Sequence, residues 1–229
     1  MNKLVKIAAA TGLMLGALAV TDAQITKQGN AYLLRMKFAK GQTAKYQMDM
    51  TMNMGAQKMS MSMPMTQKVT NVRANGAAEI NYTMGPMSMN GKPMGNQTQS
   101  TRIVMDPSGK VIEGQNMGQT GASVSLPAKP VRVGESWTVN TKMAAGTAGP
   151  MDVKATYTLA GFQTIAGKQA AKINVKMSAA GQMSMNGSGT MLLLSSDGSL
   201  HSANINMNMK GQQQGQQMNV TSTIALKRV

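Results

Sequence analysis

The feature that most constrains the fold of this chain is a run of methionines at every second position. The segment YQMDMTMNMGAQKMSMSMPMTQK, residues 46–68, places eight methionines within 18 residues. Side chains at positions i, i+2 and i+4 of a β-strand point to the same face of the sheet. Two sets of four methionines therefore each share a face: Met48, Met50, Met52 and Met54, and Met59, Met61, Met63 and Met65.

The polar residues between these methionines complete the pattern of a half-buried antiparallel hairpin, with one apolar and one polar face. A four-residue loop over 55–58 would pair Met54 with Met59. At the far end of the same hairpin it would pair Met48 with Met65. We therefore expect all eight methionines on one side of one hairpin.

The same alternation recurs along most of the chain after residue 23, in AAEINYTM, DVKATYTLA, AAKINVKMS, HSANINMNMK and NVTSTIALK. Turn-forming residues separate these segments, among them Asn75-Gly76 and Asp197-Gly198. Alternating runs bounded by turn signals are typical of strands. We predict an all-β fold of about ten to twelve strands, forming a strongly curved antiparallel sheet or an open barrel.

An internal repeat suggests two related halves. The sequence AAEIN at 77–81 matches AAKIN at 170–174, and each is followed by MSMNG, at 87–91 and at 183–187. The spacing differs between the copies, so we interpret them as a degenerate duplication. We predict a single all-β domain over 24–229. Its related halves would span about 41–115 and 150–229, joined by 116–149.

Residues 1–23 have the pattern of an export signal. Lys3 and Lys6 precede an apolar run, and small residues follow that would allow cleavage after Ala19 or Ala23. The apolar run is shorter than the ~20 residues that a transmembrane helix needs. We predict a signal peptide that forms a helix, with the mature protein in the periplasm or cell envelope of a bacterium, outside the cell or bound to its surface, and not integral to the membrane.

The composition excludes several kinds of chemistry. The chain has no Cys and one His, His201, so thiol catalysis and a His-rich zinc or copper(II) site are ruled out. No Ser lies in a nucleophile motif that His201 would serve. We expect no enzymatic activity and no cofactor. The net charge of +15 is scattered along a chain with few aromatic residues. That distribution favours an anionic envelope surface over nucleic acid as a partner.

The methionines themselves admit three interpretations. They are the core of the sheet, or they line a face that holds an apolar or amphipathic molecule, because Met is flexible and polarisable and accepts varied partners. The third interpretation is a Cu(I) or Ag(I) site, since thioethers suit soft cations. For that site the candidate ligands are Met50, Met52, Met61 and Met63. The candidate ligand-lining residues are the eight methionines of 48–65 together with Trp137, the only Trp in the chain.

The segment LPAKPVRVGESW, residues 126–137, and the order of segments around it resemble an uncharacterised family of exported bacterial β-sheet proteins, a domain of unknown function rich in Met and Thr. That family opens with Lys-x-Gly and has a Pro-Val-x-Val-Gly-(Asp/Glu)-Ser-Trp signature. The residues that match the signature are Pro130, Val131, Val133, Gly134, Glu135, Ser136 and Trp137. Lys40 and Gly41 correspond to the opening segment but are adjacent, without the intervening residue of the family pattern. The resemblance implies an exported β-sheet protein and adds no chemistry.

The sequence thus predicts a non-catalytic exported binding protein that holds an apolar or amphipathic small molecule or lipid on a methionine-lined sheet face. A structural or adhesive envelope protein with a closed Met-rich core is the first alternative. Periplasmic Cu(I) or Ag(I) binding through Met-x-Met clusters is the second.

Overall fold

The structure, a computed structural model, describes residues 24–114, 125–144, 150–180, 183–213 and 216–229. The predicted signal peptide, its helix and both cleavage positions lie outside these residues. These described residues form fifteen β-strands. The first nine are β1 (Ile25–Gln28), β2 (Ala31–Leu34), β3 (Thr43–Met54), β4 (Gln57–Val72), β5 (Ala78–Met84), β6 (Ser88–Met89), β7 (Lys92–Pro93), β8 (Gln99–Met105) and β9 (Val111–Gly114). The others are β10 (Ser136–Ala144), β11 (Pro150–Ile165), β12 (Lys168–Ala179), β13 (Met183–Leu194), β14 (Leu200–Gln213) and β15 (Gln216–Arg228).

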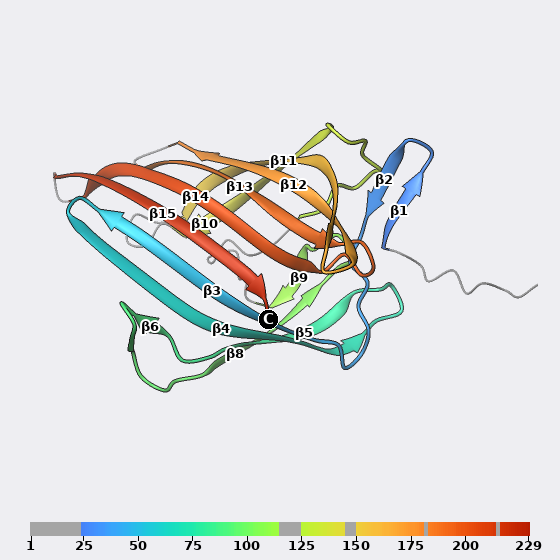
Figure 1. Ribbon diagram of the computed structural model, residues 1–229, viewed down its shortest axis with the longest axis horizontal. Coiled ribbons are helices and arrows are strands. Elements are labelled where there is room, and N and C mark those ends of the chain that lie inside the picture. The colour runs from blue at the N-terminus through green and yellow to red at the C-terminus, as the bar shows by residue number, and fades with distance from the viewer. Residues whose placement is uncertain (1–23, 115–124, 145–149, 181–182, 214–215) are drawn as a thin grey trace, which may run out of the picture.

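One large sheet dominates the molecule, which confirms the all-β prediction (Figure 1). Its strands run in the order β10-β11-β12-β13-β14-β15-β3-β4-β5-β8-β9, and every pair is antiparallel. The sheet curls strongly without closing, because β9 and β10 stay as its two edges in the described residues. The strand count exceeds the prediction because it includes short strands: β6 and β7 have two residues each, and β1, β2 and β9 have four.

The order of the sheet is two meanders joined in the middle. Strands β3, β4, β5, β8 and β9 form the first, and β10 to β15 form the second. Strand β15 pairs with β3, so the last strand of the chain lies beside the first strand of the large sheet. No helix in the described part of the chain is long and apolar enough to cross a bilayer.

The β3–β4 hairpin has a different register from the one expected. Met54 lies opposite Gln57, so the connection is the two-residue turn Gly55-Ala56 and not a four-residue loop. Gly55 has φ of +59°, as glycine often has at the first position of a tight hairpin turn. The predicted partners Met54–Met59 and Met48–Met65 are therefore wrong. The observed methionine pairs are Met52–Met59, Met50–Met61 and Met48–Met63.

This shift moves each partner by two residues, and a strand has a side-chain period of two. All eight methionines consequently remain on one face of the hairpin, as expected. That face is the inner face of the curled sheet. Tyr46 and Met65 belong to the same core cluster as Leu159 and Ile173 of β11 and β12, from the opposite wall.

The main core fills one end of the curled sheet. Leu34, Leu159, Ile173 and Leu193 are fully buried there. The β1–β2 hairpin covers this end, where Tyr32 forms a β-bridge with Val131. Burial of these aliphatic side chains is the main source of stability, at roughly 25 cal/mol per Å² of apolar surface removed from water.

The repeated sequences take matching places at their starts. Ala78 and Ile80 of β5 and Ala171 and Ile173 of β12 are all 0% exposed. The MSMNG copies differ, however. Asn90 and Gly91 of the first form the turn of the β6–β7 hairpin, with positive φ, whereas the second lies within the continuous strand β13. The division of the domain into related halves stays a prediction.

Candidate ligand-binding face

Methionines from five strands, β3, β4, β6, β12 and β14, share the inner face of the sheet near the β3–β4 turn, which lies at the left of Figure 1. We define the Met-lined face as the nine half-buried methionines Met50, Met52, Met54, Met59, Met61, Met89, Met177, Met207 and Met209. The strand register shows that they share a face. One row of directly paired residues runs Met177–Gly187–Met207–Ser222–Met52–Met59 across six strands.

The expected ligand-lining residues divide into two groups. Met48, Met63 and Met65 pack against the main core, and Met65 is only 6% exposed. The other five, from Met50 to Met61, lie further along the hairpin and are half-buried. The three core members thus match the core interpretation. The five others belong to a face that keeps part of its apolar surface in contact with solvent.

Trp137 lies across the molecule from the hairpin, on the edge strand β10. Its ring stacks on Tyr157 at a centroid distance of 5.5 Å, and its Nε1–H donates a 2.8 Å hydrogen bond to the Ser125 carbonyl. Trp137 packs against the same main core as Met48 and Met63. The structure therefore brings Trp137 to the core that supports the Met-lined face, and not to the face itself.

Ser222 interrupts the methionines with a polar group. It lies between Met207 and Met52 in the row defined above and is 4% exposed. Its Oγ is buried and has no hydrogen-bond partner among the described residues. A buried hydroxyl without a partner costs about 1–3 kcal/mol. Within the described structure, Ser222 is thus an unsatisfied polar group in an apolar surface.

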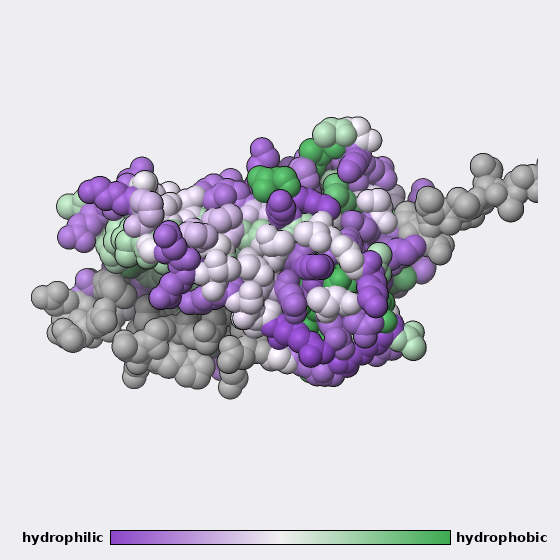
Figure 2. All heavy atoms as spheres, turned by 90° about the horizontal axis from the view of Figure 1, so that it is seen from below, coloured by the Kyte–Doolittle hydropathy of each residue, from purple (hydrophilic) through white to green (hydrophobic). Residues whose placement is uncertain are grey.

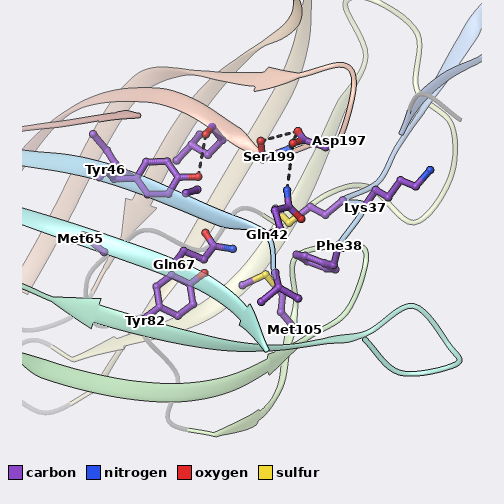
Figure 3. Close-up of a pocket in the computed structure, with 15 residues that line it drawn as sticks. Lys37, Phe38, Gln42, Tyr46, Met65, Gln67, Tyr82, Met105, Asp197 and Ser199 are labelled. Carbon is purple, nitrogen blue, oxygen red and sulfur yellow. Dashed lines mark hydrogen bonds between the residues drawn. The ribbon is translucent and has the colours of Figure 1, made fainter. Parts of the chain in front are cut away.

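A small cavity lies at the opposite end of the β3–β4 hairpin, between Tyr46, Tyr82, Gln67 and the Asp197 turn (Figure 3). Its volume is about 70 Å³, which holds a few water molecules and no acyl chain. Asp197 accepts hydrogen bonds from Gln42 Nε2 at 3.4 Å and Ser199 Oγ at 2.6 Å. Burial raises the pKa of Tyr46 to about 12 and also raises that of Tyr82. Both phenols are therefore neutral hydrogen-bonding groups.

The outer face of the sheet is polar. Ser, Thr and Asn form hydrogen bonds between neighbouring strands, such as Thr223 Oγ1 to Asn206 Oδ1 at 2.7 Å and Ser136 Oγ with Thr158 Oγ1 at 2.7 Å. Figure 2 shows one side of the molecule, where hydrophilic residues prevail and hydrophobic ones gather in small patches. The hydrogen-bonded polar side chains thus lie on the face of these strands opposite the inward-facing apolar residues.

Hard-metal ligands do not gather in the part of the chain that the structure describes, where no three His, Asp or Glu side chains are grouped to hold an ion. His201 is half-buried on β14. Asp106 and Asp197 are turn residues: each accepts a hydrogen bond from the backbone N–H of a Ser two residues later, at 2.8 and 2.9 Å. Methionine thioethers are the soft ligands that the inner face offers.

The predicted ligand-lining residues did not include four members of the Met-lined face: Met89, Met177, Met207 and Met209. Each of these residues lies in an alternating segment, so the sequence predicts which side chains of that strand share its face. The sequence does not predict which strands are neighbours, because the pairing of β15 with β3 joins segments from the two ends of the chain. The proposed metal ligands Met50, Met52, Met61 and Met63 all share the face, but only Met50 and Met61 are directly opposite one another.

Comparison with known proteins adds a family match and a distant structural similarity. Residues 116–223 are similar to a family of unknown function (DUF6263), and this range includes 130–137 but not Lys40 and Gly41. No curated protein matches the chain in sequence. The crystal structure of the hypothetical lipoprotein YmcC from Escherichia coli (K12) is similar with a TM-score of 0.34 and 13% identity, over 82% of this chain and 88% of that one.

Proposed function

We propose that this chain is a non-catalytic binding protein of the bacterial envelope, and that its Met-lined face holds one acyl chain of an anionic amphiphile. The observation that carries the proposal is the contrast along the inner face. At the capped end the aliphatic side chains are fully buried. Among the described residues toward the β3–β4 turn, only a smaller cluster of Met151, Val153 and Met185 is grouped as buried core, and the nine methionines of the Met-lined face are half-buried.

The choice of residue supports a ligand of variable shape. Val and Ile favour strands more than Met does, and β12 uses them at inward positions 173 and 175. Met has three rotatable bonds and a polarisable sulfur, so a Met surface adapts to guests that differ in length or bend. Covering the remaining exposed apolar surface would stabilise a complex at roughly 25 cal/mol per Å².

The charge of the protein supports an anionic head group. Lys and Arg number 23 against 8 Asp and Glu, and the basic residues are spread over the chain. Such a surface attracts fatty acids, anionic phospholipids and the membrane surfaces that contain them. The export pattern of residues 1–23 and the resemblance of 130–137 to an exported family support a place in the periplasm or at the envelope.

Native mass spectrometry of protein purified from its own envelope tests the proposal. The expected result is a population one lipid heavier than the bare chain. We expect the double variant Met52→Gln, Met207→Gln to lose that population, because both residues lie in the row around Ser222. The matched control is Met87→Gln, Met94→Gln, since these two methionines are 39% and 57% exposed.

Either of two results would overturn the proposal: wild-type protein without any lipid adduct, or an adduct that survives the Met52 and Met207 changes in a folded protein. The first of these would favour the alternative of a structural envelope protein. Far-UV circular dichroism of each variant shows whether the sheet has formed.

A further inference from the structure

Three methionines from three neighbouring strands stand at one level of the inner face. Met50 of β3 lies directly opposite Met61 of β4, and Met61 lies directly opposite Met89 of β6. Directly paired residues in an antiparallel sheet point to the same face. All three residues are half-buried, so none of them is sealed in the core or fully exposed to solvent.

The third strand is held in place by specific bonds. Asn90, the residue after Met89, accepts a 2.9 Å hydrogen bond from the backbone N–H of Ser60 through its Oδ1. Its own N–H donates to the Ser60 carbonyl at 2.8 Å. Asn90 has φ of +51° and Gly91 of +77°, which forms the tight turn of the β6–β7 hairpin. The bonds between Asn90 and Ser60, which are the chain neighbours of Met89 and Met61, thus hold Met89 beside Met61.

The geometry fits convergence of three sulfurs on one point. Neighbouring strands are about 4.8 Å apart, so the outer two methionines stand on either side of Met61 at about that distance. Each Met side chain has three rotatable bonds, which let Met50 and Met89 lean toward Met61. Three thioethers around one point form a low-charge, soft ligand set. Such a set suits Cu(I) or Ag(I), and it does not suit Zn²⁺, Ca²⁺ or Mg²⁺.

We propose that Met50, Met61 and Met89 form a binding site for one soft monovalent cation, Cu(I) or Ag(I). This site replaces the set Met50, Met52, Met61 and Met63 expected from the sequence, because Met52 and Met63 pair with Met59 and Met48. It is distinct from the lipid proposal, since it needs three sulfurs at one level and not a continuous apolar surface.

One charge opposes the site. Lys92 of β7 lies directly opposite Met89 and is exposed. A solvated ammonium acts on a nearby ion through water and salt, which screen the repulsion strongly. Lys92→Gln should therefore strengthen binding modestly, by less than about tenfold, and more at low salt than at high salt.

The test is titration of lipid-free, full-length protein with Cu(I) under reducing, oxygen-free conditions against a chromophoric Cu(I) chelator, and with Ag(I) by calorimetry. We expect one ion per chain. The triple variant Met50→Leu, Met61→Leu, Met89→Leu should bind at least about tenfold more weakly, because Leu keeps the volume and removes the sulfur. The control Met87→Leu, Met94→Leu, Met105→Leu removes as many sulfurs elsewhere and should bind as the wild type does.

Absence of Cu(I) and Ag(I) binding, or equal losses in the triple variant and its control, would overturn the site. If the triple variant does not fold, Met89→Leu alone decides the matter, because β6 is a two-residue strand outside the main core clusters. That single change should still weaken binding, and unchanged affinity would refute the proposal. Lipid retention by native mass spectrometry is measured separately, so failure of one proposal does not imply failure of the other.

Discussion

Tyr46 of β3 lies directly opposite Met65 of β4, two positions away from the partner that a four-residue loop would have given Met65. This pair sets the register of the whole hairpin and therefore decides which methionines are neighbours. The two registers differ at the connection between the strands, where Gly55 begins either a two-residue turn or a four-residue loop.

The register can be tested with pairs of cysteines, since the chain has none of its own. Met50→Cys with Met61→Cys places the two Cβ atoms directly opposite each other, about 4.5–5.5 Å apart. Met50→Cys with Met63→Cys would be opposite only in the other register. We expect mild oxidation to form a disulfide faster in the first variant, as measured by thiol counting. Faster closure of the second pair would contradict the observed turn.

Alkaline pH should destabilise the protein through Tyr46. Tyr46 is 6% exposed, and its phenol donates a 3.1 Å hydrogen bond to the Leu200 carbonyl; burial raises the pKa of this phenol from 10.0 to about 12. Below pH 10 the phenol is protonated in both states, so its contribution is complete. Between pH 10 and 12 only the unfolded chain loses the proton, which lowers the free energy of unfolding by up to about 1.4 kcal/mol per pH unit.

Urea unfolding at pH 8, 10 and 11.5 measures this loss. Tyr46→Phe should be about 1 kcal/mol less stable than wild type at pH 8, because the hydrogen bond to Leu200 is gone. Between pH 8 and pH 11.5 the Tyr46→Phe variant should then lose less stability than the wild type does. Burial raises the pKa of Tyr82 and Tyr157 as well, so some dependence remains. Identical pH dependence in wild type and variant would contradict the assignment to Tyr46.

Removing the Ser222 hydroxyl should stabilise the protein. Because its Oγ is buried without a partner in the part of the chain that the structure describes, Ser222→Ala should raise the free energy of unfolding by about 1 kcal/mol. The control is the next residue on the outer face: Thr223→Ala loses the 2.7 Å bond to Asn206 and should be slightly destabilising. Thermal and urea unfolding of the two variants give the comparison, and a destabilised Ser222→Ala would show that the hydroxyl has a partner.

Gly198 should not accept a side chain. It has φ of +67°, and a Cβ added there would lie 2.0 Å from the Arg35 carbonyl oxygen. Gly167 also has a positive φ, +76°, but its added Cβ would meet no atom of the described residues within 4 Å. Gly167→Ala should therefore cost only the backbone strain of about 1–2 kcal/mol. Gly198→Ala should cost clearly more, since the turn before β14 must also move away from Arg35. Equal midpoints in urea for the two variants would refute this.

Much of the fold could be predicted from the sequence because the alternation of side chains along a strand is a local property. That the methionines of β3 and those of β4 each share one face follows from their spacing at positions i and i+2 alone. The two sets remain on the same face of the hairpin although the predicted pairing register was wrong. A two-residue change of turn length conserves the face and changes every partner. No residue in 46–68 separates the two turns decisively, because glycine at position 55 suits either.

Only part of the Met-lined face could be predicted from the sequence, for a different reason. Met89, Met207 and Met209 reach the face through strands far away in sequence, and their neighbours depend on the order of the sheet. That order includes the pairing of Ile224 with Met50, between strands more than 160 residues apart. Long-range pairings of this kind depend on how whole faces pack together, and local patterns do not encode them.

The sequence by itself determined the all-β class, the two-faced strands and the concentration of thioethers on one of those faces, because these depend on side-chain periodicity and composition. The tertiary structure decided that the sheet curls without closing, that the aliphatic core at its capped end is fully buried, and that the nine methionines of the Met-lined face are half-buried. It also decided that Met50, Met61 and Met89 stand at one level. These depend on sheet twist, on strand order and on a turn of two residues, which act between segments and not within them.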